Sequence, residues 1–191
     1  MDRRRIFASF GALIAAPVMF DRAFAQSGMA MPGLTVGPAE MAYAKQTLAV
    51  GSLSLLASRL AATKAAGRKL QEFVKFEIAE QETVADILTG MMKPPSAAMG
   101  MVMAPTDDQA RANIDQAGTD KLNTLSGLSG TAFDTAYVQA EVDGHQKLLV
   151  VQNSYLGSGK NREALDVAKL AKGMITEHLQ LLSDIQSRHL G

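Results

Sequence analysis

Apolar side chains recur every three or four residues from residue 38 onward, which is the spacing of one face of an α-helix. The pattern predicts five helices, over residues 38–66, 68–89, 106–126, 131–155 and 162–188. No segment alternates strictly between apolar and polar positions, as a strand with one exposed face does. The pattern therefore predicts an all-α fold.

Local signals support the ends of these helices. Pro38 and Glu40 suit a first helical turn, because Pro needs no backbone N–H partner there and a carboxylate faces the positive end of the helix dipole. Thr106 and Gln109 have the spacing of a capping box, in which each side chain bonds the backbone of the other residue. Gly90 is a typical residue for a C-terminal helix stop.

The segment 91–105 contains Pro and no helical period, so we expect a long loop between two pairs of helices. Two long helices, a long crossover and two more long helices are typical of a four-helix bundle. The shorter helix over 106–126 is an additional element. Residues 38–191 are therefore expected to form one bundle with an extra short helix and a long crossover loop that contains Met and Pro. Residues 26–37 are expected to be a flexible leader.

The first 25 residues have the pattern of a signal peptide. Arginines at positions 3–5 precede an apolar stretch from Ile6 to Phe20, which is shorter than the about 20 apolar residues that a spanning helix needs. Ala23-Phe24-Ala25 supplies the small residues of a cleavage site near Ala25. We expect export to the periplasm or secretion, and a mature chain without a transmembrane anchor. Arg4-Arg5-Ile6-Phe7 fits a twin-arginine signal, and an ordinary Sec signal is the alternative.

Composition excludes several classes of protein. The chain has 191 residues with 19 basic and 19 acidic side chains, so its formal net charge is +0. A nucleic-acid-binding protein would show a basic run or face, so we expect no nucleic-acid partner. The chain has no Cys, which excludes disulfides, thiolate metal sites and Cys nucleophiles.

Carboxylates and imidazoles lie on the apolar faces of three predicted helices. Glu77 and Glu80 share a face because they are three residues apart, and Glu141 and His145 share one because they are four apart. His178 follows the apolar row of the last helix. Helical bundles hold metal ions with Glu and His side chains from facing helices. These five residues are therefore candidate ligands for Fe or Mn.

Two interpretations of these residues remain open. One is a metal centre of the di-metal oxidase type. Against it, no Asp or Glu occurs between Glu40 and Glu72, and neither the helix over 68–89 nor the helix over 162–188 has the Glu-x-x-His motif of such centres. The other interpretation is a metal-free polar network, in which His145 and His178 bond Glu80, Gln81 or Glu141. The missing motifs favour the network.

Methionines cluster in the predicted crossover loop. Met99, Met101 and Met103 alternate along the chain, and thioethers are soft ligands for Cu(I). This spacing makes the three residues a candidate copper site. The alternative is that these flexible side chains cover one end of the bundle or form a surface for a protein partner.

Several runs resemble the domain of unknown function 4142 family of exported bacterial proteins. They comprise Leu70 to Phe73, Ala79 to Thr83, Leu125 to Gly130, Phe133-Asp134-x-x-Tyr137, His145 and Glu177-His178-Leu179. The resemblance covers nearly all of the mature chain, and it implies a ferritin-like helical fold and export. It implies no reaction. Many members have Asp-His where this chain has Glu80 and Gln81, and Glu in the first helix near Ser54 and Leu56.

Taken together, the patterns predict an exported helical bundle that works by binding or association, in a structural or stress-associated role, rather than by turnover. A protein partner is one expectation. The alternatives are a di-metal centre built from the candidate Glu and His residues and Cu(I) binding through the Met-rich loop.

Overall fold

The computed structural model describes residues 36–93 and 100–189. Within these ranges the chain forms six helices and no strand, so the predicted all-α fold is confirmed. The helices are α1 (Pro38–Lys64), α2 (Arg68–Met91), α3 (Asp107–Arg111), α4 (Gln116–Ser126), α5 (Gly130–Ser158) and α6 (Arg162–His189). None of them is sufficiently long and apolar to cross a membrane. The predicted signal peptide and nearly all of the predicted leader lie outside the described residues.

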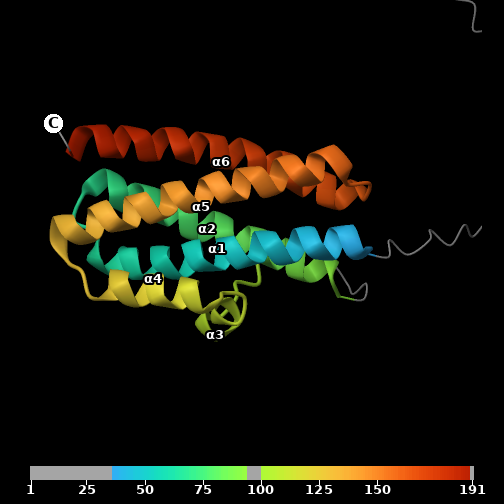
Figure 1. Cartoon of the computed structure of the whole chain (residues 1–191), viewed down its shortest axis with the longest axis horizontal. Coiled ribbons are helices and arrows are strands. Elements are labelled where there is room, and N and C mark those ends of the chain that lie inside the picture. Colours follow the sequence, from blue (N-terminus) through green and yellow to red (C-terminus); the bar gives the residue numbers. More distant parts are fainter. Residues whose placement is uncertain (1–35, 94–99, 190–191) are drawn as a thin grey trace, which may run out of the picture. The chain divides into compact units, whose positions relative to one another are not determined.

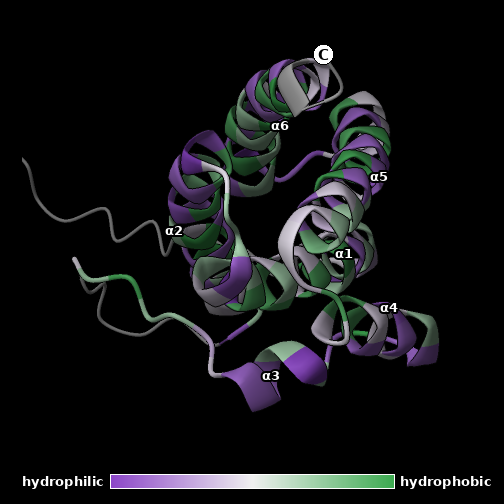
Figure 2. Cartoon of the chain, turned by 90° about the vertical axis from the view of Figure 1, so that its left-hand side faces the viewer, coloured by the Kyte–Doolittle hydropathy of each residue, from purple (hydrophilic) through white to green (hydrophobic). Residues whose placement is uncertain are grey.

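The four long helices pack around a shared interior (Figure 1). α1 contacts α2 and α5, and α6 contacts the same two helices from the opposite side. The view in Figure 2 shows α3 and α4 on the outer side of α1, away from α6. The more specific prediction of a ferritin-like topology stays a prediction.

The structure corrects the prediction of one helix over residues 106–126. Two helices, α3 and α4, occupy this segment. Thr106 and Gln109 do form the predicted capping box, with bonds of 2.9 and 3.2 Å between each side chain and the other residue's backbone. A new helix then begins at Gln116, and the carboxylate of its N-cap residue, Asp115, accepts the N–H of Gly118 at 2.8 Å. Asn113 lies in the break and donates to Ser52 of α1, which ties the connection to the bundle.

The other boundaries differ from the predictions by a few residues. α1 ends at Lys64 instead of residue 66, and α2 continues to Met91, which belongs to the predicted loop. α5 runs through Gly144 and continues to Ser158, so the turn before α6 is shorter than expected. Differences of this size are common at helix ends, because the last turns fray and carry weak sequence signals.

The apolar core consists of two larger clusters and a small one, which contains Leu148, Ala171 and Ile175. One larger cluster contains Phe73, Tyr137 and Leu182, and the other contains Tyr43 and Leu88. These two lie toward opposite ends of the long helices. Between them along the helices lie buried polar residues at the middle of α1, α2, α5 and α6. These polar groups include Ser54, Ser58, Glu77, Glu141, His145 and His178. A polar layer between two apolar clusters has little access to water, so its groups must satisfy one another.

Candidate metal centre

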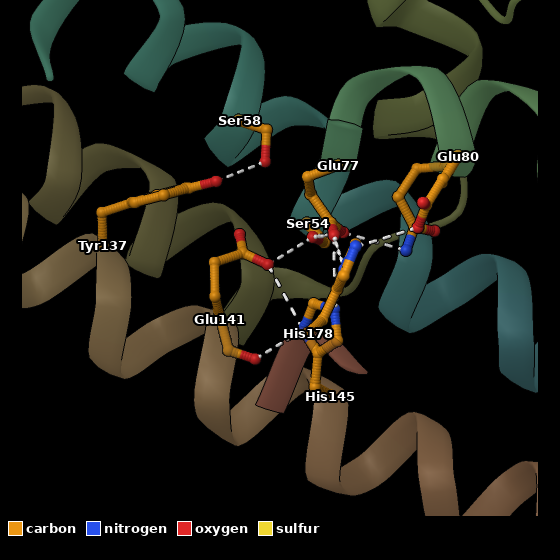
Figure 3. A network of polar contacts seen from close by, with 9 residues as sticks. Ser54, Ser58, Glu77, Glu80, Tyr137, Glu141, His145 and His178 are labelled. Atoms are coloured by element: carbon orange, nitrogen blue, oxygen red, sulfur yellow. Dashed lines mark hydrogen bonds and ion pairs between the residues drawn. The ribbon is translucent and has the colours of Figure 1, made fainter. Parts of the chain in front are cut away.

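One carboxylate and two imidazoles converge in the middle of the bundle (Figure 3). Oε2 of Glu77 lies 2.8 Å from Nδ1 of His178 and 3.2 Å from Nε2 of His145. The two imidazole nitrogens lie 3.1 Å from each other. The three atoms come from α2, α5 and α6 and form a nearly equilateral triangle. The exposed fraction of each residue is at most 4%.

The remaining ring nitrogens are also held by oxygen atoms. Nδ1 of His145 donates to the backbone carbonyl of Glu141 at 2.8 Å, one helical turn earlier. Nε2 of His178 lies 3.1 Å from a carboxylate oxygen of Glu80. These bonds orient both rings, so that the two other nitrogens face Glu77.

The second oxygen of Glu77 is bound by side chains of α1 and α2. Ser54 donates to Oε1 at 2.5 Å, and Gln81 donates to the same atom at 2.9 Å. The hydroxyl oxygen of Ser54 is also 2.5 Å from Oε2 of Glu141. A hydroxyl has one proton to donate, so one of the two carboxyl groups must itself be protonated.

The proton belongs to Glu141. Burial, followed by the negative charge of Glu77, raises the pKa of Glu141 to about 8. The protonated carboxyl donates to Ser54, and Ser54 donates to Glu77. Burial also acts to raise the pKa of Glu77, but the hydrogen bonds from His145 and His178 outweigh it, so this pKa is lowered. The chain of bonds therefore ends on an ionised Glu77.

His178 carries the balancing positive charge. Burial lowers the pKa of this imidazole, but hydrogen bonds to Glu77 and Glu80 exceed that effect and raise it to about 10. Burial lowers the pKa of His145 as well, but the hydrogen bond to Glu77 and the charge of this carboxylate raise it. Since Nδ1 of His145 donates to a carbonyl, a proton on its Nε2 faces both Oε2 of Glu77 and Nδ1 of His178.

The surroundings of the triangle are apolar, with one small space. The ring of Phe73 lies 5.0 Å from the ring of His178 and 6.3 Å from that of His145. A cavity of about 20 Å³ touches both imidazoles and is also lined by Met174 and Glu80. A space above about 10–15 Å³ holds one water molecule.

The structure brings together three of the five residues singled out in the sequence as ligands of a bundle centre. Glu77, His145 and His178 meet, whereas Glu80 contacts only the outer nitrogen of His178. The side chain of Glu141 points to Ser54 and is 3.6 Å from the nearer nitrogen of His145. In the described residues the three converging groups can therefore surround a single ion.

The polar-network interpretation matches some contacts. His178 pairs with Glu80, and His145 bonds the backbone of Glu141, as expected. Gln81 bonds Glu77 instead of an imidazole. Glu77 is the shared partner of both His residues, a role that no pattern in the sequence indicated.

Two serines of α1 take part in the polar layer without any sign of it in the sequence. Ser54 joins the two carboxyl groups, and Ser58 bonds the hydroxyl of the fully buried Tyr137 at 2.7 Å. Figure 3 shows this second pair beside the carboxylates, on the Glu141 side. A serine inside a helix carries no sequence signal of burial. The middle of α1 has no Asp or Glu, so any polar group that α1 contributes to the buried layer must be a neutral side chain such as Ser.

The Phe133-Asp134-x-x-Tyr137 motif supports the fold near this layer. Phe133 and Tyr137 are fully buried. The carboxylate of Asp134 accepts the backbone N–H groups of Ala66 and Gly67 at 3.3 Å, in the turn between α1 and α2. The motif therefore holds the start of α2 against α5, and it contributes no ligand to the triangle.

Met101 and Met103 do not line the cavity beside the two imidazoles. Met101 and Met103 are exposed by 73% and 55%, in the segment before α3. Met99 lies outside the described residues. The copper site suggested by the spacing of these three residues stays a prediction.

Comparison with known proteins agrees with the resemblance seen in the sequence. Neither the curated proteins nor the solved structures gave a significant match to the chain. The family model described as Domain of unknown function (DUF4142) matches residues 23–185, which include α1 to α5 and most of α6. With its family motif and its buried Glu and His residues inside this match, the chain belongs to the DUF4142 family.

Proposed function

We propose that this protein binds one divalent transition-metal ion, Fe²⁺ or Mn²⁺, between Glu77, His145 and His178. The triangle of ligand atoms carries the proposal. Its edges of 2.8, 3.1 and 3.2 Å are close to the separation of about 3 Å between neighbouring ligands in an octahedral site with bonds of about 2.1 Å. Two imidazoles and one carboxylate on one face are the ligands typical of non-haem Fe²⁺ sites.

The outer contacts of the triangle support the same proposal. Metal-binding imidazoles commonly donate their second N–H to a carboxylate or a backbone carbonyl, which fixes the ring and makes it a better ligand. His178 meets Glu80 in this way, and His145 meets the carbonyl of Glu141. A metal ion would take the place of the proton that now lies among the three atoms. Binding would therefore release a proton.

The space at the site supports metal binding rather than turnover of an organic substrate. The cavity beside the imidazoles has a volume of about 20 Å³, which suits one water-sized ligand on the ion. We further propose, from the pattern of residues 1–25, that the protein is exported and holds its ion outside the cytoplasm. An exported metal-binding bundle is compatible with a stress-associated role without catalysis.

Metal analysis of the full chain tests the proposal. The protein is purified from the exported fraction without chelators or a metal-binding tag, its metal content is measured, and the stripped protein is titrated with Mn²⁺ and Fe²⁺ under anaerobic conditions. We expect one ion per chain, with binding lost in His178→Ala and in His145→Ala. Glu177→Ala is the matched control, because Glu177 adjoins His178 but is exposed.

Circular dichroism of each variant shows whether it folds. A second variant, Glu80→Gln, retains the three ligands and changes only the partner of His178, so we expect affinity to fall about 10-fold or more without loss of the site. Absence of binding by the native protein would overturn the proposal. So would two ions per chain, or binding that survives both His substitutions.

A further inference from the structure

A second and larger cavity lies between α1, α4 and α5. Its volume is about 250 Å³. The walls are mainly apolar and include Val50, Leu53, Ala57, Ile114, Leu125 and Ala140. Gly144 of α5 also lines it, and a Cβ atom at this position would have only Val50 nearby, at 3.9 Å. The small residues on α5 therefore leave space that larger side chains would fill.

The cavity has a charged outer part and a buried inner part. Lys121 of α4 and Lys147 of α5 line it and are exposed, whereas Ser54 and Glu141 line it and are buried. Within the described part of the chain, neither lysine has an ion-pair or hydrogen-bond partner at its side chain. The cavity thus extends from two unpaired cations toward the polar layer of the bundle.

Two acidic residues, Asp115 and Glu141, also line the cavity. Asp115 caps α4 through the N–H of Gly118 at 2.8 Å. The carboxyl group of Glu141 bonds Ser54. The hydrogen bond from Gly118 leaves the negative charge of Asp115 in place, so the exposed charges of the lining are two lysines and one carboxylate, and the excess of positive charge favours an anion.

We propose that this cavity binds a small amphipathic carboxylate, with its apolar body against α1 and α5 and its carboxylate beside Lys121 and Lys147. An apolar cavity of about 150 Å³ accepts benzene. A volume of about 250 Å³ therefore suits a larger body, such as an aliphatic chain of about eight carbon atoms. None of the three residues of the metal triangle lines this cavity, so binding there does not require an ion.

Octanoate is the probe for this site. Its binding to the metal-free full-length protein is measured by isothermal titration calorimetry and compared with that of 1-octanol and octylamine, which have the same chain with a neutral or a positive end. We expect octanoate to bind about fivefold more tightly than 1-octanol, and octylamine to bind most weakly. The double substitution of Lys121→Gln and Lys147→Gln should remove the advantage of octanoate and leave 1-octanol binding unchanged.

Filling the cavity provides an independent test. Gly144→Leu adds a side chain in the space beside Val50, and Leu is also a better helix former than Gly, so the variant should fold. We expect it to abolish octanoate binding. Gly173→Leu is the matched control, because a Cβ atom added at Gly173 of α6 would meet nothing within 4 Å and this residue lines no part of the cavity. Ala140→Leu, in the same wall, is a second filling variant.

The proposal is wrong if the native protein binds no octanoate, if 1-octanol binds as tightly, or if both filling variants still bind octanoate. Because the protein is stripped of metal for these measurements, failure of the metal proposal does not affect their result.

Discussion

Nε2 of His145 lies 3.1 Å from Nδ1 of His178, and both atoms face the same oxygen of Glu77. Two protonated imidazoles at this distance would repel each other, whereas one shared proton satisfies both nitrogens and the carboxylate. A metal ion would satisfy the same three atoms. The same three atoms therefore stabilise the metal-free protein by holding a proton and would bind a metal ion in its place.

Glu77→Gln should strongly destabilise the metal-free protein. The substitution removes the buried negative charge that both imidazoles face, and breaking a buried ion pair costs about 3–5 kcal/mol. We expect the free energy of unfolding, measured with urea, to fall by about this amount. Glu177→Gln is the control, since that residue is exposed and its change should be within about 0.5 kcal/mol. Equal effects of the two substitutions would contradict the assignment of Glu77 as the counter-charge.

The metal-free protein should lose stability as the pH rises from about 6 to about 9. The pKa of His178 rises from 6.5 to about 10 on folding, so its contribution is complete below pH 6.5 and is lost as the pH approaches 10. The pKa of Glu141 rises from 4.5 to about 8, so its contribution also declines across the pH range between these values. Both changes have the same sign because in each case the folded state holds the proton more tightly.

The lowered pKa of Glu77 acts in the opposite direction, and its contribution is lost as the pH falls below its ordinary value of 4.5. Stability should therefore be greatest in mildly acidic solution. Urea unfolding at a series of pH values measures the profile, and His178→Ala should flatten its alkaline side. A stability that rises between pH 6 and pH 9 would show that these groups do not hold their protons in the folded protein.

Arg59→Ala should loosen α3 with little effect on the whole bundle. The guanidinium of Arg59 bonds Glu82 at 2.8 Å, Asp107 at 2.6 Å and the carbonyl of Pro105 at 2.9 Å. These contacts join α1 to α2 and to the start of α3. Because the pairs are partly exposed, we expect a loss of at most about 1 kcal/mol in global stability. Proteolysis between Pro105 and Asn113 should accelerate, because the bonds of Arg59 hold the start of this segment against α1.

Limited proteolysis followed by mass spectrometry locates the cleavage sites. Arg68→Ala is the control, because the side chain of Arg68 is 91% exposed and pairs only with Glu72 among the described residues, at 3.4 Å. If both variants are cleaved at the native rate, Arg59 is not the tether of α3.

The positions of the helices could be predicted where the signals are local. The capping box of Thr106 and Gln109 works within one turn, and the predicted starts of α2 and α6 are confirmed. The break before Asp115 was missed, although Asp is a common N-cap residue. Apolar residues keep a helical period across the break, so the pattern predicts one continuous helix. The bond from Asn113 to Ser52 that accompanies the break joins residues far apart in the chain, and a local pattern does not indicate it.

The candidate site could be predicted in part for the same reason. The sequence was sufficient to indicate an all-α chain and to place Glu77, His145 and His178 on inward faces, because helical periodicity is a property of each segment alone. It contained no information on how far each helix is shifted and rotated against its neighbours. That arrangement depends on packing between distant residues such as Phe73, Tyr137 and Leu182. Packing placed Ser54 between two carboxyl groups and Glu80 outside the triangle, and so selected three atoms as a candidate metal site.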